Sequence, residues 1–151
     1  MLSIYLDTNV YITGLLQSKT NSARILEEMT EGAIRVIQSD YLFDEVLAWF
    51  KQHKGKNIVG GVRNYLLSIP IRESVHRPEW GVFVEKLKDK VKDIDDLPHI
   101  CSYIAGSCDY FITTNRKLTQ EAVREIVNFK SPKEFIEDVL HKKGIETEFG
   151  V

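Results

Sequence analysis

The sequence lacks several features that mark specialised classes of protein. Among its 151 residues are only two cysteines, Cys101 and Cys108, and no Cys-x-x-Cys motif, which argues against a disulfide framework and a zinc site. No apolar run approaches the roughly 18 residues of a membrane-spanning helix. Residues 1–7 contain no basic segment and do not read as a signal peptide. We therefore expect a cytoplasmic protein that does not associate with membranes.

The charge balance excludes a uniformly basic protein that coats nucleic acid. The chain has 20 Lys and Arg against 22 Asp and Glu, a formal net charge of -2. The lysine-rich segments 51–56 and 86–92 are more typical of solvated faces than of binding surfaces. Apolar residues make up 43% of the chain, enough for a core, and the length fits one domain over residues 1–151.

Strand and helix signals alternate along the chain. Short apolar runs rich in β-formers predict strands that are buried on both faces, and amphipathic segments predict helices between them. The expected strands are 1–6, 34–37, 110–113 and 126–129, with a weak edge strand at 70–75. The expected helices are 10–17, 21–30, 40–53, 62–67, 80–87, 97–105, 119–124 and one that starts at 132. This alternation predicts an α/β protein, a three-layer α/β/α sandwich with a central parallel sheet of four or five strands.

Four polar residues occupy positions where such a sheet collects ligands, namely outside the carboxyl ends of its strands. Asp7 ends the first strand, and Asn115 follows the strand near residue 112. Glu45 borders the buried stripe of its helix, and Asp96 opens another helix. Each also has an ordinary structural explanation. Asp7 and Asp96 fit helix N-caps, Glu45 an edge position, and Asn115 a turn.

Taken together, these residues indicate a metal site. Two unpaired carboxylates 4 Å apart repel by about 4 kcal/mol at an effective dielectric near 20, so three of them need a cation. Ligands that are all oxygen select Mg²⁺ or Mn²⁺. The four histidines are scattered along the chain, and we assign none of them a catalytic role. Such a site suits hydrolysis of phosphodiester bonds, because a metal lowers the pKa of water and stabilises the leaving oxygen.

Five segments carry a resemblance to a known family. They read IYLDTNV at 4–10, SDYLFDEV at 39–46, KDIDDLP at 92–98, CDYFITTN at 108–115 and SPKEFI at 131–136. In this order and spacing they resemble the PIN-domain nucleases, and within that family they are similar to the VapC-like toxin components of prokaryotic toxin–antitoxin systems. Each segment alone is weak, but the set is specific and extends from residue 1 to about residue 138.

The resemblance implies a PIN-like fold and a metal-dependent endoribonuclease that hydrolyses single-stranded RNA. It also implies a homodimer and a cognate antitoxin protein. By matching positions, the catalytic set would comprise Asp7, Glu45, Asp96 and Asn115, of which Asp7, Glu45 and Asp96 would hold Mg²⁺ or Mn²⁺. Asn9 would hold the turn after Asp7, and the Thr113 hydroxyl would support the site. Arg116 and Lys117, next in the chain, are candidate RNA contacts.

Asn115 departs from the family pattern, which has Asp at this position. An amide oxygen can ligate a metal or orient a water, but it adds no charge, so we expect weaker binding of a second metal. The leading hypothesis is therefore a ribonuclease toxin. The alternative is a catalytically weak or inactive PIN-fold module that binds RNA or protein. A third reading is a phosphatase of the haloacid dehalogenase type with Asp7 as nucleophile, but Asn9 stands where its second acid belongs.

Overall fold

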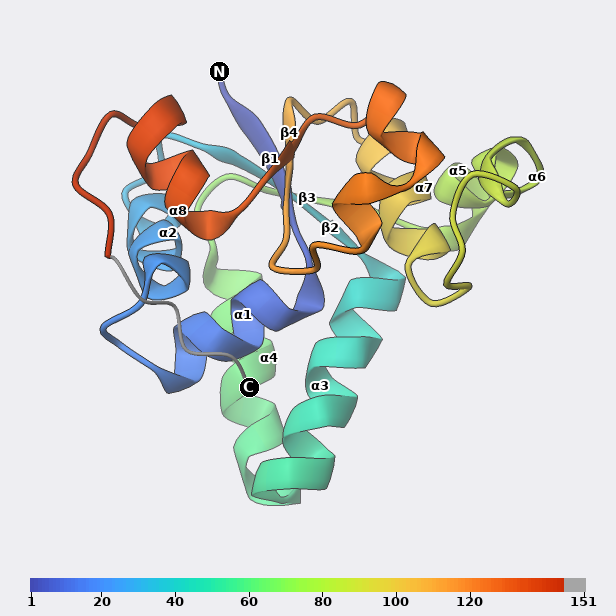
Figure 1. Cartoon of the computed structure of the whole chain (residues 1–151). Coiled ribbons are helices and arrows are strands. Elements are labelled where there is room, and N and C mark those ends of the chain that lie inside the picture. Colours follow the sequence, from blue (N-terminus) through green and yellow to red (C-terminus); the bar gives the residue numbers. More distant parts are fainter. Residues whose placement is uncertain (146–151) are drawn as a thin grey trace.

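A five-stranded sheet forms the centre of the computed structural model, which describes residues 1–145 (Figure 1). All of its strand pairs are parallel, and the strand order is β3-β2-β1-β4-β5. The strands are β1 (Ser3–Leu6), β2 (Arg35–Ser39), β3 (Arg72–Val75), β4 (Tyr110–Ile112) and β5 (Phe129–Lys130). The sheet thus confirms the predicted parallel arrangement at the upper number of expected strands.

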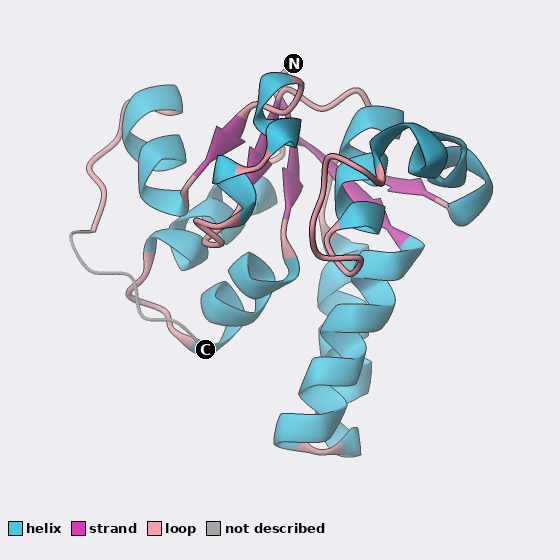
Figure 2. Cartoon of the chain, turned by 45° about the vertical axis from the view of Figure 1, so that its right-hand side comes forward, coloured by secondary structure: helices cyan, strands magenta, loops and turns pink. Residues whose placement is uncertain are grey.

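Helices and helical turns connect the strands (Figure 2). The α-helices are α1 (Thr8–Leu16), α2 (Asn21–Thr30), α3 (Asp40–Lys54), α4 (Val59–Ser68), α5 (Arg77–Trp80), α6 (Val84–Leu87), α7 (Leu97–Ala105) and α8 (Pro132–Glu134). The 3₁₀ turns are η1 (Lys56–Ile58), η2 (Gly81–Phe83), η3 (Leu118–Gln120) and η4 (Ala122–Glu125), and η5 (Phe135–Val139) is a π-helical turn. None of the helices in residues 1–145 has the length and apolar character that crossing a bilayer requires.

The two faces of the sheet are covered by different helices, which makes the predicted three layers. On one face, Phe111 of β4 packs against Tyr103 of α7. On the other, Tyr110 packs against Phe135 of η5, and Gln38 of β2 donates a hydrogen bond to the Leu66 carbonyl of α4. Helices α3 and α4 extend away from the sheet as a hairpin (Figure 1). The core therefore lies on both faces of the sheet, as expected for parallel strands.

One close contact fixes the end of α7 against the sheet. Gly106 follows α7, and a Cβ atom at this position would lie 2.6 Å from Cγ2 of Ile37 on β2. That distance is shorter than real Cβ contacts, so glycine allows the helix end to approach the strand. This contact helps to hold the other end of α7, which carries Asp96, at the carboxyl edge of the sheet.

The central strand, β1, positions that edge. Ile4 pairs with Val36 of β2 on one side and with Tyr110 of β4 on the other. All four β1 residues are buried. The chain runs from β1 to β2 and later returns to add β4 on the opposite side, so the strand order reverses at β1. Ligands of open α/β sheets bind at this kind of position.

Several predicted element boundaries are wrong after residue 115. The helix expected at 119–124 is instead the two 3₁₀ turns η3 and η4, and the strand expected at 126–129 is Phe129–Lys130. The last helix has one α-helical turn and then widens, because the Leu140 N–H bonds to the Phe135 carbonyl five residues earlier. Earlier in the chain, α1 starts at Thr8 rather than residue 10, and the helix expected at 80–87 is divided among α5, η2 and α6.

Candidate active site

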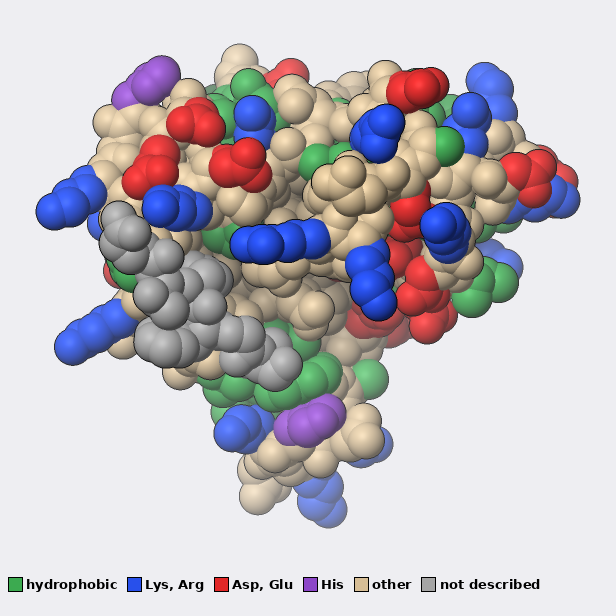
Figure 3. Space-filling model, in the orientation of Figure 1, with side chains coloured by type: hydrophobic (Ala, Val, Ile, Leu, Met, Phe, Trp, Pro, Cys, Tyr) green, Lys and Arg blue, Asp and Glu red, His purple; other side chains and the backbone are tan. Residues whose placement is uncertain are grey.

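The carboxyl edge of the sheet holds a cavity of about 390 Å³. Its lining includes all four predicted catalytic residues, from the end of β1, helix α3, the start of α7 and the loop after β4. The full lining is Asp7, Thr8, Asn9, Ile12, Glu45, Ala48, Trp49, Gln52, Asp95, Asp96, His99 and Asn115. The structure therefore brings together residues that are up to 108 positions apart in sequence (115 minus 7). Figure 3 shows Asp and Glu side chains gathered beside Lys and Arg side chains on one face.

The carboxylate of Asp7 is held from two directions. Its Oδ1 accepts a hydrogen bond from the Thr8 N–H at 2.8 Å, so Asp7 does cap helix α1. Its Oδ2 accepts a hydrogen bond from the Thr113 hydroxyl at 2.8 Å. The side chain is nearly buried, at 8% exposed. The N-cap role and the cavity position of Asp7 thus occur together, and Thr113 is hydrogen-bonded to it.

Glu45 belongs to a hydrogen-bonded chain that reaches into the core. Its Oε1 accepts from the Thr8 hydroxyl and lies 2.6 Å from Nε2 of His99. Nδ1 of His99 is 2.6 Å from the Tyr5 hydroxyl, which is 2.9 Å from Oγ of Ser39. His99, Tyr5 and Ser39 are buried. A continuous polar chain therefore runs from the cavity into the space between the sheet and α7.

The Glu45–His99 contact has the character of an ion pair. Burial raises the pKa of Glu45, but the hydrogen bond and the charge of His99 outweigh it, so the carboxyl titrates below its usual 4.5. Burial lowers the pKa of His99, but the hydrogen bond that its ring donates to Glu45 and the nearby Asp7 charge prevail and raise it above 6.5. Each partner thus favours the charged form of the other.

His99 is a cavity residue that the sequence analysis did not assign. It lies three positions after Asp96 on the same helix, a spacing that places both side chains on one face. The spacing from Asp96 is the sequence feature that could have identified His99 as a site residue. The sequence does not show its contact with Glu45, because Glu45 belongs to a different helix.

The ionised form of Asp96 is disfavoured in the cavity. Its carboxylate does not cap α7, contrary to the ordinary explanation for an acid at a helix start. Burial, together with the charges of Asp7 and Asp93, raises the pKa of the Asp96 carboxyl to about 7. A cation bound between these groups would reverse this effect.

The donor chemistry of the cavity fits a hard divalent cation, because Asp7, Glu45 and Asp96 all offer carboxylate oxygens. The geometry of a metal site is not preformed. Within residues 1–145, no group of three or more His, Cys, Asp or Glu is arranged to hold a metal ion. Glu45 Oε1 is instead engaged by Thr8 and His99. Binding a cation here would therefore require side chains to turn.

Asn115 lies at the cavity, but its oxygen closes a turn. Its Oδ1 accepts hydrogen bonds from the backbone N–H groups of Lys117 and Leu118, at 3.1 and 3.3 Å. The Asn115 N–H donates to Oγ1 of Thr113 at 3.0 Å. The turn explanation thus accounts for the oxygen that a second metal would use.

Of the remaining predicted site residues, one lines the cavity, one lines a neighbouring groove and one lines neither. Asn9 is exposed and lines the cavity, while the turn after Asp7 is held by the Asp7 carboxylate and by the bond from the Val10 N–H to the Asp7 carbonyl. Arg116 lines a neighbouring groove, and Lys117 lines neither hollow. Their roles as RNA contacts stay predictions.

Comparisons with known proteins agree with the fold described above. A family model described as a PIN domain matches residues 3–117. VapBC2 from Rickettsia felis bound to promoter DNA is 15% identical, with a TM-score of 0.63 over 86% of this chain and 98% of that one. VapBC-1 from nontypeable Haemophilus influenzae is 16% identical, with a TM-score of 0.59 over 87% and 98%. VapC20 of Mycobacterium tuberculosis, a sarcin–ricin loop cleaving toxin, is 10% identical, with a TM-score of 0.52 over 72% and 86%. No curated protein matches the sequence. At these identities, the likeness to solved structures shows a shared fold.

Proposed function

Since the chain belongs to the PIN domain family, we propose that it is a metal-dependent endoribonuclease that cuts single-stranded RNA as the toxin of a toxin–antitoxin pair. One observation carries this proposal. Asp7, Glu45 and Asp96 line a single cavity at the carboxyl edge of the sheet, and the pKa of Asp96 is raised there by burial and by its acidic neighbours. Such a cluster favours a divalent cation, and a phosphodiester is the substrate class that such a cation serves.

In this proposal, Asp7, Glu45 and Asp96 would hold Mg²⁺ or Mn²⁺. When bound, that ion supplies Lewis acidity and lowers the pKa of a water molecule. The surrounding residues orient the carboxylates. Thr113 and the Thr8 N–H fix the two oxygens of Asp7, and His99 with the Thr8 hydroxyl fixes Oε1 of Glu45. His99 is therefore a positioning residue in this proposal, because it acts through Glu45.

A second candidate function is a PIN-fold module that binds RNA or protein and cleaves slowly or not at all. Asn115 favours it, because the side chain brings no charge and its oxygen is already bonded to two backbone N–H groups. The same observation argues that an active site would use one metal ion rather than two.

The proposal includes a cognate antitoxin, a homodimer and a cytoplasmic location. Structural neighbours that are VapBC complexes support the antitoxin partner. The homodimer is carried over from the family resemblance, and the cytoplasmic location is proposed with it.

The experiment that tests this function is cleavage of end-labelled single-stranded RNA with Mn²⁺, Mg²⁺ or EDTA. We expect cuts that require metal and disappear in Asp7→Asn. Asp44→Asn is the matched control, because Asp44 lies on the same helix as Glu45 but is exposed and outside the cavity. Cleavage that survives both EDTA and Asp7→Asn would contradict the proposal. Silence of the wild type with activity in Asn115→Asp would favour the inactive binding module.

A further inference from the structure

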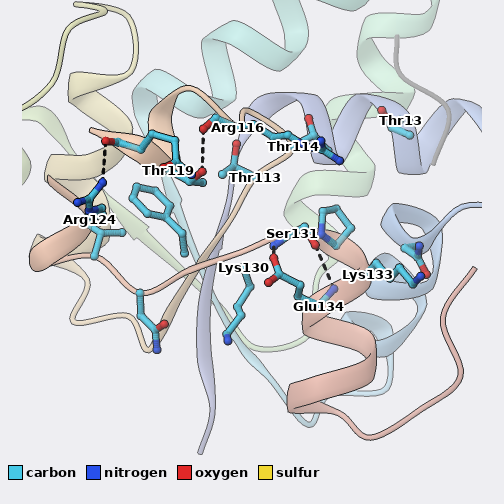
Figure 4. A pocket seen from close by; sticks show the side chains of 16 residues that line it. Thr13, Thr113, Thr114, Arg116, Thr119, Arg124, Lys130, Ser131, Lys133 and Glu134 are labelled. Carbon is cyan, nitrogen blue, oxygen red and sulfur yellow. Dashed lines mark hydrogen bonds between the residues drawn. The ribbon is translucent and has the colours of Figure 1, made fainter. Parts of the chain in front are cut away.

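A second, larger hollow adjoins the acidic cavity. It has a volume of about 990 Å³ and lies between the η3–η4 turns on one side and β5 with α8 on the other (Figure 4). Its lining carries Arg116, Arg124, Lys130 and Lys133. We call this hollow the basic groove and define it by these four cations.

Within residues 1–145, no acidic side chain forms an ion pair with a cation of the basic groove. The Arg124 side chain donates to the backbone carbonyl of Gln120, at 3.2 Å, and Nζ of Lys130 lies 6.0 Å from the ring of Tyr110. In a chain with a net charge of -2, four cations around one hollow, without an ion pair in residues 1–145, form a concentrated positive field.

The one carboxylate that residues 1–145 contribute to the lining, Glu134, is already engaged. Oε1 of Glu134 accepts a hydrogen bond from the Ser131 N–H at 2.8 Å, as part of the capping box that starts α8. Figure 4 shows this pair at the edge of the pocket. Glu134 therefore has a structural function, and its single negative charge leaves these five groups with a net charge of +3 (4 minus 1).

Thr113 joins the basic groove to the acidic cavity. Its side chain lines the groove, and its hydroxyl donates to Oδ2 of Asp7. Asp7 follows β1, Thr113 follows β4 and Ser131 follows β5, and these three strands are neighbours in the sheet. Because adjacent strands lie about 4.8 Å apart, the groove extends from Thr113, beside Asp7, to the end of β5, roughly 10 Å from β1. The two sites can therefore contact neighbouring parts of one strand of nucleic acid.

We propose that the basic groove holds the sugar–phosphate backbone of single-stranded RNA on one side of the bond that is cut. This inference rests on the proposed function, since it assigns the substrate a path across the protein. The groove contacts phosphates through Lys130, Lys133, Arg116 and Arg124, while the exposed Thr114 offers its hydroxyl to sugar and phosphate oxygens. The acidic cavity alone repels RNA, so the groove supplies the attraction.

The test separates binding from cleavage by measuring fluorescence anisotropy of a labelled mixed-sequence 20-nucleotide RNA in EDTA, across a range of salt concentrations. The variant is Lys130→Gln with Lys133→Gln. The matched control is Lys54→Gln with Lys56→Gln, which removes the same charge from exposed positions at the far end of α3. Lys130→Arg with Lys133→Arg keeps the charge and tests rescue. Circular dichroism melts confirm that each variant folds.

We expect the groove variant to bind RNA about tenfold more weakly. We also expect its salt dependence, as the slope of log affinity against log salt, to fall by about 1.4, or 0.7 for each lost phosphate contact on a single strand. The control Lys54→Gln with Lys56→Gln and the variant Lys130→Arg with Lys133→Arg should both match the wild type in affinity and slope. Equal affinity and slope in the groove variant would overturn the proposal, even where Mn²⁺-dependent cleavage upholds the nuclease. Loss of affinity for a poly-glutamate peptide with RNA binding unchanged would overturn it in favour of an acidic protein partner. RNA binding that depends on the groove, without cleavage, would uphold the groove and reject the nuclease.

Discussion

Replacing His99 by leucine tests the buried polar chain most directly. The substitution removes two contacts of 2.6 Å, one to the Glu45 carboxylate and one to the Tyr5 hydroxyl, from a side chain that is 2% exposed. A hydrogen bond to a charged group contributes about 1.5–3 kcal/mol and one between neutral groups about 0.5–1.5 kcal/mol. We therefore expect His99→Leu to lower the free energy of unfolding by about 3 kcal/mol. In a chain of this size that corresponds to roughly 6–12 °C in Tm.

Urea denaturation followed by circular dichroism measures this loss, with His53→Leu as the control. His53 is exposed and stacks on Trp49, so its replacement should cost about 0.5 kcal/mol or less. A double-mutant cycle with Glu45→Gln isolates the coupling between His99 and Glu45. A coupling energy of zero within error, or a loss for His99→Leu no larger than for the control, would refute the reasoning.

The pH dependence of the same loss provides a second check on sign. The pKa of His99 in the folded protein is raised above its usual 6.5, so its contribution to stability is complete below that pH and declines as the pH rises through the folded value. The difference between wild type and His99→Leu should therefore be larger at pH 6 than at pH 9. The opposite order would mean that the buried imidazole is held neutral.

Four further outcomes follow from the site. Asp96→Asn should raise the free energy of unfolding at pH 8 by an amount on the order of 1–2 kcal/mol, because the raised pKa of Asp96 makes its ionised form destabilising. The change should be small near pH 4, and thermal melts at both pH values measure the two effects as shifts in Tm. Mn²⁺ at 100 times its Kd should stabilise the folded wild type by about 2.7 kcal/mol, which appears as a higher Tm in the same melts. It should leave the Tm of Asp7→Asn unchanged. Thr113→Val should cost about 1–2 kcal/mol in urea, since it removes the hydroxyl bonded to Asp7, and a loss near zero would contradict that bond. Asn115→Asp should increase the rate of RNA cleavage measured with Mn²⁺, and an unchanged rate would show that this position does not limit the site.

The sequence was sufficient to place the acidic residues because their positions follow from sheet geometry. Parallel strands end at one edge, so Asp7 and Asn115 had to lie near each other, and helical periodicity directed Glu45 inward. Its contact with His99 was not predictable, because it joins two helices whose relative position depends on tertiary packing. Ligand geometry was equally inaccessible, since Glu45 bonds to His99 and Thr8 instead of standing free.

The region after Asn115 shows a different limit. Short segments with weak periodicity were predicted as one helix and one strand, whereas the chain forms 3₁₀ turns and a two-residue strand. Those irregular segments build the basic groove. Its four cations span 17 positions in sequence (133 minus 116), so they form no continuous run of charge. The clustered lysines at 51–56 and 86–92, interpreted from the sequence as solvated faces, do not line the groove, whereas Arg116, a predicted RNA contact, does.

The central place of β1 has a consequence for the order in which the chain is made. Residues 1–45 supply two of the acidic side chains early, but Asp96 and the strand that completes the site, β4, emerge from the ribosome much later. Until then β1 has an unpaired edge, and its pairing with β4 closes a loop of about 106 residues, a slow kind of contact. The growing chain therefore lacks a complete site until β4 has been made, and the acidic cavity is finished only once β4 has joined the sheet.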